Sequence, residues 1–193
     1  MSKLYFRYGA MGSGKTIDLL KVAYNYKERG QDVVIYTAKI DDRYEVGKVT
    51  TRIGIQSDAF TFDTDTNIYR QVKLMEKKPA CILVDEAQFL TRKQVLMLTD
   101  IVDILEIPVI CYGLRTNFKM RFFEGSEPLM EMADKIEEIK TICDCGRKAT
   151  VNMRMINGVP VTNGPDILIG GNDSYKAVCR KCYKRLTHHV AGI

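Results

Sequence analysis

The feature that most constrains the fold of this chain is the segment Gly9 to Thr16, whose sequence is GAMGSGKT. It matches the pattern G-x-x-x-x-G-K-[ST] at every defined position. The short run Leu4 to Tyr8 before it predicts a strand, and the apolar spacing from Thr16 to Arg29 predicts a helix that Gly30 ends. A glycine-rich turn between a strand and a helix curls its backbone N–H groups around phosphate oxygens. The segment therefore predicts a site for the phosphates of ATP or GTP.

Two side chains of this loop and the end of a later strand carry the expected phosphate chemistry. Lys15 is a compact cation for the β- and γ-phosphates, and the Thr16 hydroxyl is a ligand for Mg²⁺. The apolar run Cys81 to Val84 predicts a buried strand, and Asp85 at its end is placed to hold the same metal. Glu86 can accept a proton from water or from a substrate hydroxyl, although an acidic pair here is also compatible with a solvated turn. The loop residues expected at the phosphates are Gly9, Met11, Gly12, Ser13, Gly14, Lys15 and Thr16.

Further runs of the sequence alternate between strand and helix patterns. Val33 to Thr37 and Val109 to Gly113 are apolar and rich in β-branched residues, which predicts buried strands. Helical spacing extends over Ile68 to Lys77, and again from an N-cap at Thr91 to about Leu105. The polar stretch Asp41 to Gly54 predicts mostly loop. This alternation predicts an α/β core of the P-loop NTPase type, with a mainly parallel, RecA-like sheet.

The six cysteines divide into two groups. Cys81 and Cys111 lie in apolar runs, which predicts that they belong to the core. Four thiolates from two turns can surround one structural Zn²⁺, and the remaining cysteines form two close pairs that suit this role. These candidate zinc ligands are Cys143, Cys145, Cys179 and Cys182. Four free thiols would show the same spacing, and His188 or His189 can replace one cysteine, so the ligand set stays open.

A change of composition near Lys140 predicts a domain boundary. Glycines and prolines replace helical periodicity after this residue. We expect a P-loop ATP-binding core over residues 1–140 and a small zinc-binding domain of short strands and loops over residues 141–193. A total of 193 residues suits one domain with such an appendage.

Composition and charge exclude several classes of protein. Hydrophobic residues make up 46% and charged residues 27% of the chain, which argues against a disordered protein. The sequence contains neither a continuous apolar run long enough for a membrane span nor a signal-peptide pattern, so a cytoplasmic protein without a membrane partner is expected. The net charge of +5 is mild and suits either a nucleic acid or a phosphate-binding pocket.

Taken together, the motifs resemble those of type II (zinc-containing) thymidine kinases, and most closely the bacterial members of that family. The resemblance covers nearly the whole chain and is much more specific than the phosphate loop alone. Its carriers are Gly9 to Thr16, Asp41 to Tyr44, Asp85 to Phe89, Tyr112 to Phe118, Cys143 to Ala149, Ile169 to Tyr175 and Val178 to Tyr183.

This resemblance implies ATP-dependent transfer of the γ-phosphoryl group to the 5′-hydroxyl of thymidine or deoxyuridine, giving dTMP and ADP in pyrimidine salvage. Glu86 is implied as the general base for that hydroxyl, with Asp41 and Arg43 beside the reacting phosphate and sugar. Asp85 and Gln88 are implied among the nucleotide-binding residues. Family members are usually homotetramers that dTTP inhibits, so the same is expected here, without nucleic acid as a partner. The sequence does not rank deoxyuridine against thymidine.

The resemblance also implies how the nucleoside is held. A loop that closes over the base, the lasso loop of the family, is expected to run from Ile169 to Tyr175, with Tyr175 near the sugar. Asn152 replaces a threonine that contacts the base in animal relatives, so its role stays open. The expected pocket walls and loop contacts are Met11, Phe89, Leu114, Phe118, Phe123, Ile169, Gly170, Gly171 and Tyr175.

Two other functions fit part of the pattern. A nucleic-acid-dependent P-loop ATPase with a zinc ribbon would also combine Asp85 and Glu86 with cysteine pairs and a positive charge, but 193 residues leave little room for the second domain of a motor. A nucleotide-sensing protein without catalytic activity is the other alternative. The intact pattern of Lys15, Thr16, Asp85 and Glu86 argues against a loss of activity.

Overall fold

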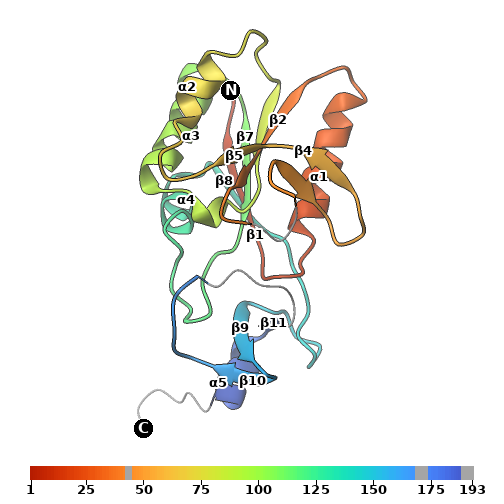
Figure 1. Cartoon of the computed structure of the whole chain (residues 1–193), viewed down its shortest axis with the longest axis vertical. Coiled ribbons are helices and arrows are strands. Elements are labelled where there is room, and N and C mark those ends of the chain that lie inside the picture. Colours follow the sequence, from red (N-terminus) through yellow and green to blue (C-terminus); the bar gives the residue numbers. More distant parts are fainter. Residues whose placement is uncertain (42–44, 168–173, 188–193) are drawn as a thin grey trace.

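The computed structural model describes residues 1–41, 45–167 and 174–187 of the chain (Figure 1). Its core is a six-stranded sheet in the order β5-β2-β6-β7-β1-β8, in which every described pairing is parallel. The strands are β1 Leu4–Tyr8, β2 Val33–Ala38, β5 Phe60–Phe62, β6 Cys81–Val84, β7 Val109–Gly113 and β8 Lys135–Glu138. The helices of this part are α1 Lys15–Lys27, α2 Ile68–Lys73, α3 Arg92–Ile104 and α4 Ser126–Met132, with a short 3-10 turn, η1, over Ala87–Phe89. The predicted α/β class is confirmed.

Helices cover both faces of this sheet, with α1 on one side and α2, α3 and α4 on the other (Figure 1). Strand β6 shows why its sequence is apolar throughout. Ile82 and Val84 pack into the core on the α3 side, whereas Cys81 and Leu83 pack into the core on the α1 side. Because successive side chains of a strand point to opposite faces, both sets must be apolar. Cys81 and Cys111 are fully buried, which confirms their predicted place in the core.

Most predicted elements are present, with changes at some ends. Thr91 caps α3 in a capping box with Gln94, because its hydroxyl accepts the Gln94 N–H at 3.2 Å and the Gln94 amide oxygen accepts the Thr91 N–H at 3.0 Å. Helix α2 ends at Lys73 and does not reach the predicted Lys77. Pro79 disfavours helical backbone just before it, and the chain must extend there to enter β6.

Some elements contradict the expectations from sequence. The segment predicted as mostly loop contains β3 Lys48–Thr50, which pairs with β4 Gln56–Asp58 in an antiparallel hairpin. The two edge strands β5 and β8 and the helix α4 have no counterpart in the predictions. Helix α5, Arg180–Thr187, lies in the part that was expected to hold only short strands and loops. Each of these elements spans eight residues or fewer, which leaves little length over which a periodic pattern can be recognised. In the described ranges, no helix combines the length and apolarity needed to cross a bilayer.

The described part of the chain after residue 140 forms what we call the C-terminal unit. It consists of a second sheet in the order β10-β9-β11, all antiparallel, and α5. Its strands are β9 Val151–Ile156, β10 Val159–Val161 and β11 Tyr175–Val178. The unit lies beyond the carboxyl end of β1 (Figure 1), the edge at which α/β sheets bind ligands. The last core strand ends at Glu138, and the exact domain boundary at residue 140 stays a prediction.

Candidate active site

The phosphate loop has the backbone that its glycines predict. Gly12 and Gly14 have φ values of 73° and 82°, a left-handed conformation that costs glycine little, and α1 begins directly after them. The ammonium group of Lys15 donates to the carbonyl oxygens of Gly9 at 3.2 Å and Ala10 at 3.1 Å. The lysine charge therefore lies against the loop that would surround the phosphates.

Asp85 meets the phosphate loop from the end of β6. Its carboxylate accepts the Thr16 hydroxyl at 3.0 Å, and its side chain is buried. Burial, followed by the negative charge of Glu86, raises the pKa of Asp85, while the hydrogen bond from Thr16 and the charge of Lys15 act in the opposite direction. The Thr16 hydroxyl and an Asp85 carboxylate oxygen lie in contact, and oxygen atoms of both kinds are ligands that Mg²⁺ prefers. These residues therefore fit the predicted metal site.

Glu86 is held in an unusual backbone conformation. Its φ of 52° lies in the left-handed region, which a residue with a side chain seldom adopts. The buried side chain of Gln88 donates to the Glu86 carboxylate at 2.5 Å and accepts the Leu114 N–H at 3.0 Å through its amide oxygen. Gln88 thus joins the turn after β6 to the loop after β7 and orients the carboxylate. Strained residues of this kind cluster at functional sites.

Two pockets meet at Glu86. The first spans about 510 Å³, including space open to solvent, and has aromatic walls from both parts of the chain. The second spans about 800 Å³, including space open to solvent, along the phosphate loop and the β3–β4 hairpin. Glu86, Met11 and Leu114 line both pockets, so the carboxylate stands at their junction.

The structure brings most of the predicted site residues to these two pockets. Gly12, Gly14, Lys15 and Thr16 line the second pocket. The residues of the predicted set that line the first pocket are Met11, Asp41, Glu86, Gln88, Phe89, Leu114, Phe118, Phe123 and Tyr175. The rings of Phe89 and Phe123 meet edge to face with centres 5.9 Å apart. Four predicted residues lie outside the described ranges: Arg43, Ile169, Gly170 and Gly171.

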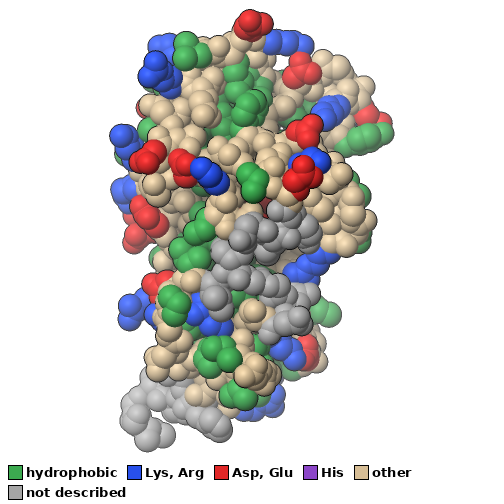
Figure 2. Space-filling model, viewed as in Figure 1, with side chains coloured by type: hydrophobic (Ala, Val, Ile, Leu, Met, Phe, Trp, Pro, Cys, Tyr) green, Lys and Arg blue, Asp and Glu red, His purple; other side chains and the backbone are tan. Residues whose placement is uncertain are grey.

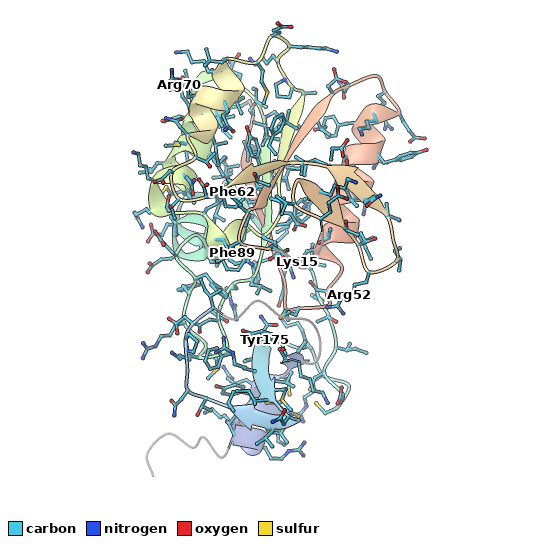
Figure 3. The ribbon with its side chains drawn as sticks, viewed as in Figure 1. Lys15, Arg52, Phe62, Arg70, Phe89 and Tyr175 are labelled. Carbon is cyan, nitrogen blue, oxygen red and sulfur yellow. The ribbon has the colours of Figure 1, made fainter. Side chains whose placement is uncertain are left out.

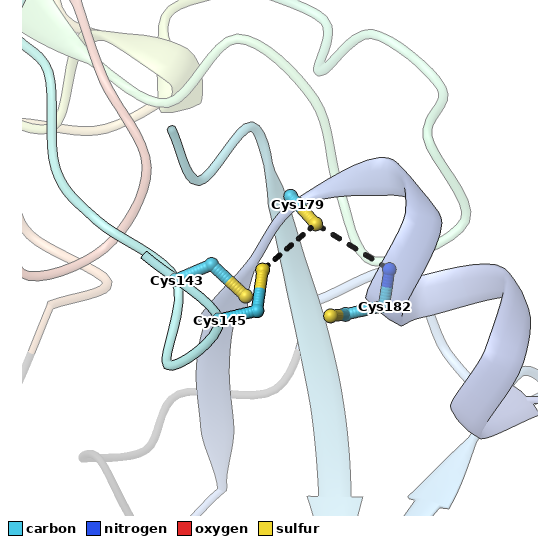
Figure 4. A group of neighbouring side chains, drawn as sticks. All are labelled: Cys143, Cys145, Cys179 and Cys182. Atoms are coloured by element: carbon cyan, nitrogen blue, oxygen red, sulfur yellow. Dashed lines mark hydrogen bonds between the residues drawn. The ribbon is translucent and has the colours of Figure 1, made fainter. Parts of the chain in front are cut away.

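The four cysteines of the C-terminal unit lie together (Figure 4). Their sulfur atoms all lie within 4.8 Å of one another, and the distance between the Cys145 and Cys179 sulfurs is 3.6 Å. A tetrahedral Zn²⁺ with bonds of about 2.3 Å needs sulfur atoms about 3.8 Å apart, so the cluster fits this ion. The Cys182 N–H donates to the Cys179 sulfur at 3.4 Å and is the largest cause that lowers the pKa of Cys179, to about 7. A lowered pKa favours the thiolate that a metal binds, whereas hydrogen bonds with the neighbouring thiols of the same cluster raise the pKa of Cys182.

Comparison with known proteins now identifies the family. The family model described as thymidine kinase matches residues 2–183 of the chain. The chain belongs to the thymidine kinase family. Proteins named thymidine kinase from Haemophilus influenzae and Vibrio parahaemolyticus are 54% and 52% identical to it over 187 residues, which is 95% of this chain and 97% of each relative. A thymidine kinase from Streptococcus thermophilus is 52% identical over 182 residues, 94% of this chain and 93% of the relative.

Within this thymidine kinase fold, several pocket residues have no strong signal in the sequence. Asn152, on β9, is buried, lines the first pocket and accepts the Met11 N–H at 2.8 Å with its side-chain oxygen. It therefore links the C-terminal unit directly to the phosphate loop. Arg52, from the β3–β4 hairpin, lines the second pocket beside the phosphate loop (Figure 3). Other lining residues outside the predicted set are Ile17, Thr50, Thr51, Thr116, Asn117, Asp166 and Ile167.

Proposed function

We propose that this protein is a thymidine kinase that transfers the γ-phosphoryl group of ATP to the 5′-hydroxyl of thymidine or deoxyuridine. One observation carries the proposal: Glu86 lines both the pocket along the phosphate loop and the aromatic pocket. A kinase needs its donor and its acceptor to meet at a base, and the junction of two pockets at a carboxylate meets this need. The names of the relatives, thymidine kinase, agree with the same chemistry.

The phosphates of ATP would bind along the phosphate loop. Lys15 would neutralise charge on the β- and γ-phosphates, and Arg52 would add a second cation from the hairpin. Thr16 and Asp85 would hold Mg²⁺, which spreads the charge that develops on the transferred group. Arg43 and Asp41 keep their expected places beside the reacting phosphate and sugar as predictions.

The nucleoside would bind in the aromatic pocket with its 5′-hydroxyl toward Glu86. The carboxylate takes the hydroxyl proton while the 5′-oxygen forms a bond to the γ-phosphorus and the bond to the β,γ-bridging oxygen breaks, so that ADP leaves. Gln88 keeps the carboxylate aimed at this oxygen. Walls from both parts of the chain keep water away from the γ-phosphate and so favour transfer over hydrolysis.

A nucleoside panel tests the function directly. With ATP and Mg²⁺, the purified protein is expected to form ADP at a rate that rises strongly when thymidine or deoxyuridine is added, because the hydroxyl is the acceptor. A parallel assay with DNA in place of the nucleoside tests the alternative function, a nucleic-acid-dependent ATPase. Equal rates with and without thymidine would refute the kinase, and stimulation by DNA that falls steeply with salt would favour the ATPase.

On the face in Figure 2, acidic and basic side chains are interspersed and form no continuous basic tract.

Replacing Asn152 with leucine should weaken ATP binding through the phosphate loop, and the same change alters the aromatic pocket that Asn152 lines. The change removes the acceptor of the Met11 N–H at nearly constant volume. A lost neutral hydrogen bond of about 1 kcal/mol corresponds to an increase of about fivefold in the KM for ATP. Initial rates at varied ATP and saturating thymidine measure it, and an unchanged KM would show that the bond does not hold the loop.

The assembly and regulation of the family are also proposed for this chain. A homotetramer, inhibition by dTTP, a cytoplasmic location and the absence of a nucleic-acid partner follow from the resemblance and stay predictions. Light scattering of the purified protein measures the oligomeric state, and initial rates with added dTTP measure the inhibition.

A further inference from the structure

Arg154, on β9, is the largest fully buried side chain among the described residues, with 2% of its surface exposed. Its guanidinium reaches three separate segments. Nη1 donates to the Pro165 carbonyl oxygen at 2.6 Å, and Nη2 and Nε donate to the Tyr175 hydroxyl at 2.7 and 3.1 Å. The Cζ atom lies 3.8 Å from the centre of the Phe118 ring. One side chain thus ties both ends of the β10–β11 connection to the loop after β7.

No carboxylate among the described residues forms an ion pair with Arg154. The carboxylate of Asp166 pairs instead with Lys119 at 2.6 Å, and Arg154 touches only the backbone oxygen of Asp166, at 3.5 Å. A buried guanidinium is costly unless its donors are satisfied, and here neutral oxygens and aromatic rings satisfy them. Arginine suits this place because its planar fork can bond several groups in fixed directions at once.

The groups that Arg154 holds form one wall of the aromatic pocket. Phe118, Asp166, Ile167 and Tyr175 line that pocket, whereas Arg154 does not. The arginine therefore lies behind the wall and would not touch a nucleoside itself. The Tyr183 hydroxyl supports the same wall from α5, because it donates to the Phe118 carbonyl oxygen at 2.9 Å.

We propose that Arg154 is a positioning residue for the nucleoside, which fixes the Phe118 ring, the Pro165–Asp166 backbone and the Tyr175 hydroxyl in one arrangement. This proposal rests on the proposed function, which supplies the nucleoside. It predicts that Arg154 sets the affinity for the nucleoside and has little influence on ATP. No hydrogen bond joins the Arg154 side chain to the phosphate loop among the described residues, and its hydrogen-bond and ring partners all lie at the aromatic wall.

The kinetic test compares Arg154→Met, Arg154→Lys and Tyr175→Phe with the wild type. Arg154→Met is expected to raise the KM for thymidine at least about tenfold and to leave the KM for ATP within about twofold, since several hydrogen bonds to the wall are lost together. Arg154→Lys, which keeps a cation but not the fork, should recover part of the loss. In the double variant Arg154→Met with Tyr175→Phe, the two increases in the KM for thymidine should not be additive, because Arg154 acts in part through the Tyr175 hydroxyl. Additive effects, or equal increases in both KM values, would overturn the proposal.

A second measurement does not depend on the substrate assignment. Hydrogen–deuterium exchange of the ligand-free protein should be faster in Arg154→Met at the amides of residues 166–167 and 174–178. Arg180→Met is the matched control, since the Arg180 side chain is exposed and has no hydrogen bond or ion pair within the described ranges. Unchanged exchange in Arg154→Met with intact zinc content would refute the positioning role.

The two measurements separate failure of this proposal from failure of the proposed function. A wild-type protein that ignores thymidine would refute the kinase, while the exchange rates would still decide what Arg154 holds. If Arg154→Met does not fold, the milder Arg154→Lys and Tyr175→Phe decide the question. A wild-type KM for thymidine in both of them would refute the proposal, and a raised KM with normal ATP binding would support it.

Discussion

A Glu86→Gln enzyme is expected to bind ATP normally and to turn over about a thousandfold more slowly, because a positioned general base contributes about 10²- to 10⁴-fold. Glutamine has nearly the same size and can still accept the hydrogen bond from Gln88, so the turn after β6 should keep its shape. What is lost is the ability to take the proton of the acceptor hydroxyl. Steady-state rates at saturating ATP and thymidine, with ATP binding measured separately by calorimetry, give the two quantities.

The matched control is Glu76→Gln, an exposed carboxylate that lines neither pocket, which should leave turnover unchanged. A large loss of ATP affinity in Glu86→Gln, with turnover intact at high ATP, would contradict the role of general base. It would place Glu86 with the phosphate-binding groups instead. A loss of both would point to a disturbed turn, which a melting curve of the variant would reveal.

A Cys179→Ser protein is expected to lose its zinc and most of its thymidine-dependent activity. A structural zinc site needs all four of its protein ligands. The binding free energy of such a zinc, about 10 kcal/mol or more, also stabilises the folded state of the unit that holds it. Asn152 and Tyr175 come from strands of the same unit, so the nucleoside pocket would lose one side. We expect activity to fall at least about tenfold, since two or more contacts are lost. Metal analysis and initial rates measure the two effects.

Cys81→Ala separates this effect from the loss of a cysteine in general. Cys81 is buried in the core sheet away from the cluster, so its replacement should lower the melting temperature and leave the zinc content unchanged. A Cys179→Ser protein that retains one zinc per chain would refute the ligand assignment. His188 and His189 lie outside the described residues, and zinc retained only when they are present would identify one of them as a substitute ligand.

The sequence predicts those parts of the site whose chemistry is written in consecutive residues. The phosphate loop, the pair Asp85 and Glu86, and the cysteine pairs each have a fixed local spacing, and the structure brings each set together. Buried strands such as β6 are also predictable, because a sheet covered on both faces needs an unbroken apolar run. The phenylalanines of the pocket were predictable only through the family resemblance, since their spacing alone suits an ordinary core.

Single polar residues gave no such signal. Arg52 and Arg154 stand alone in the sequence, and Asn152 stands out only through the family resemblance, without a role; the partner of Asn152 on the phosphate loop lies far along the chain. Their significance depends on the face of the strand that carries them. On β9, Val151 and Met153 pack into the core of the C-terminal unit, and the alternate residues Asn152 and Arg154 reach the phosphate loop and the aromatic wall. The sequence alone does not show which of these two sets of side chains faces the core, because the pairing of β9 with β10 and β11 determines it.

The position of β1 in the sheet has a consequence for synthesis on the ribosome. This strand is made first, yet its neighbours are β7 and β8, which end at Gly113 and Glu138. The nascent chain therefore carries the strand before the phosphate loop without its partners until more than half of the protein has been made. At about 5–20 residues per second this interval lasts several seconds or more. We expect chaperones to bind stalled nascent chains that end before β7 and to release those long enough to expose β8.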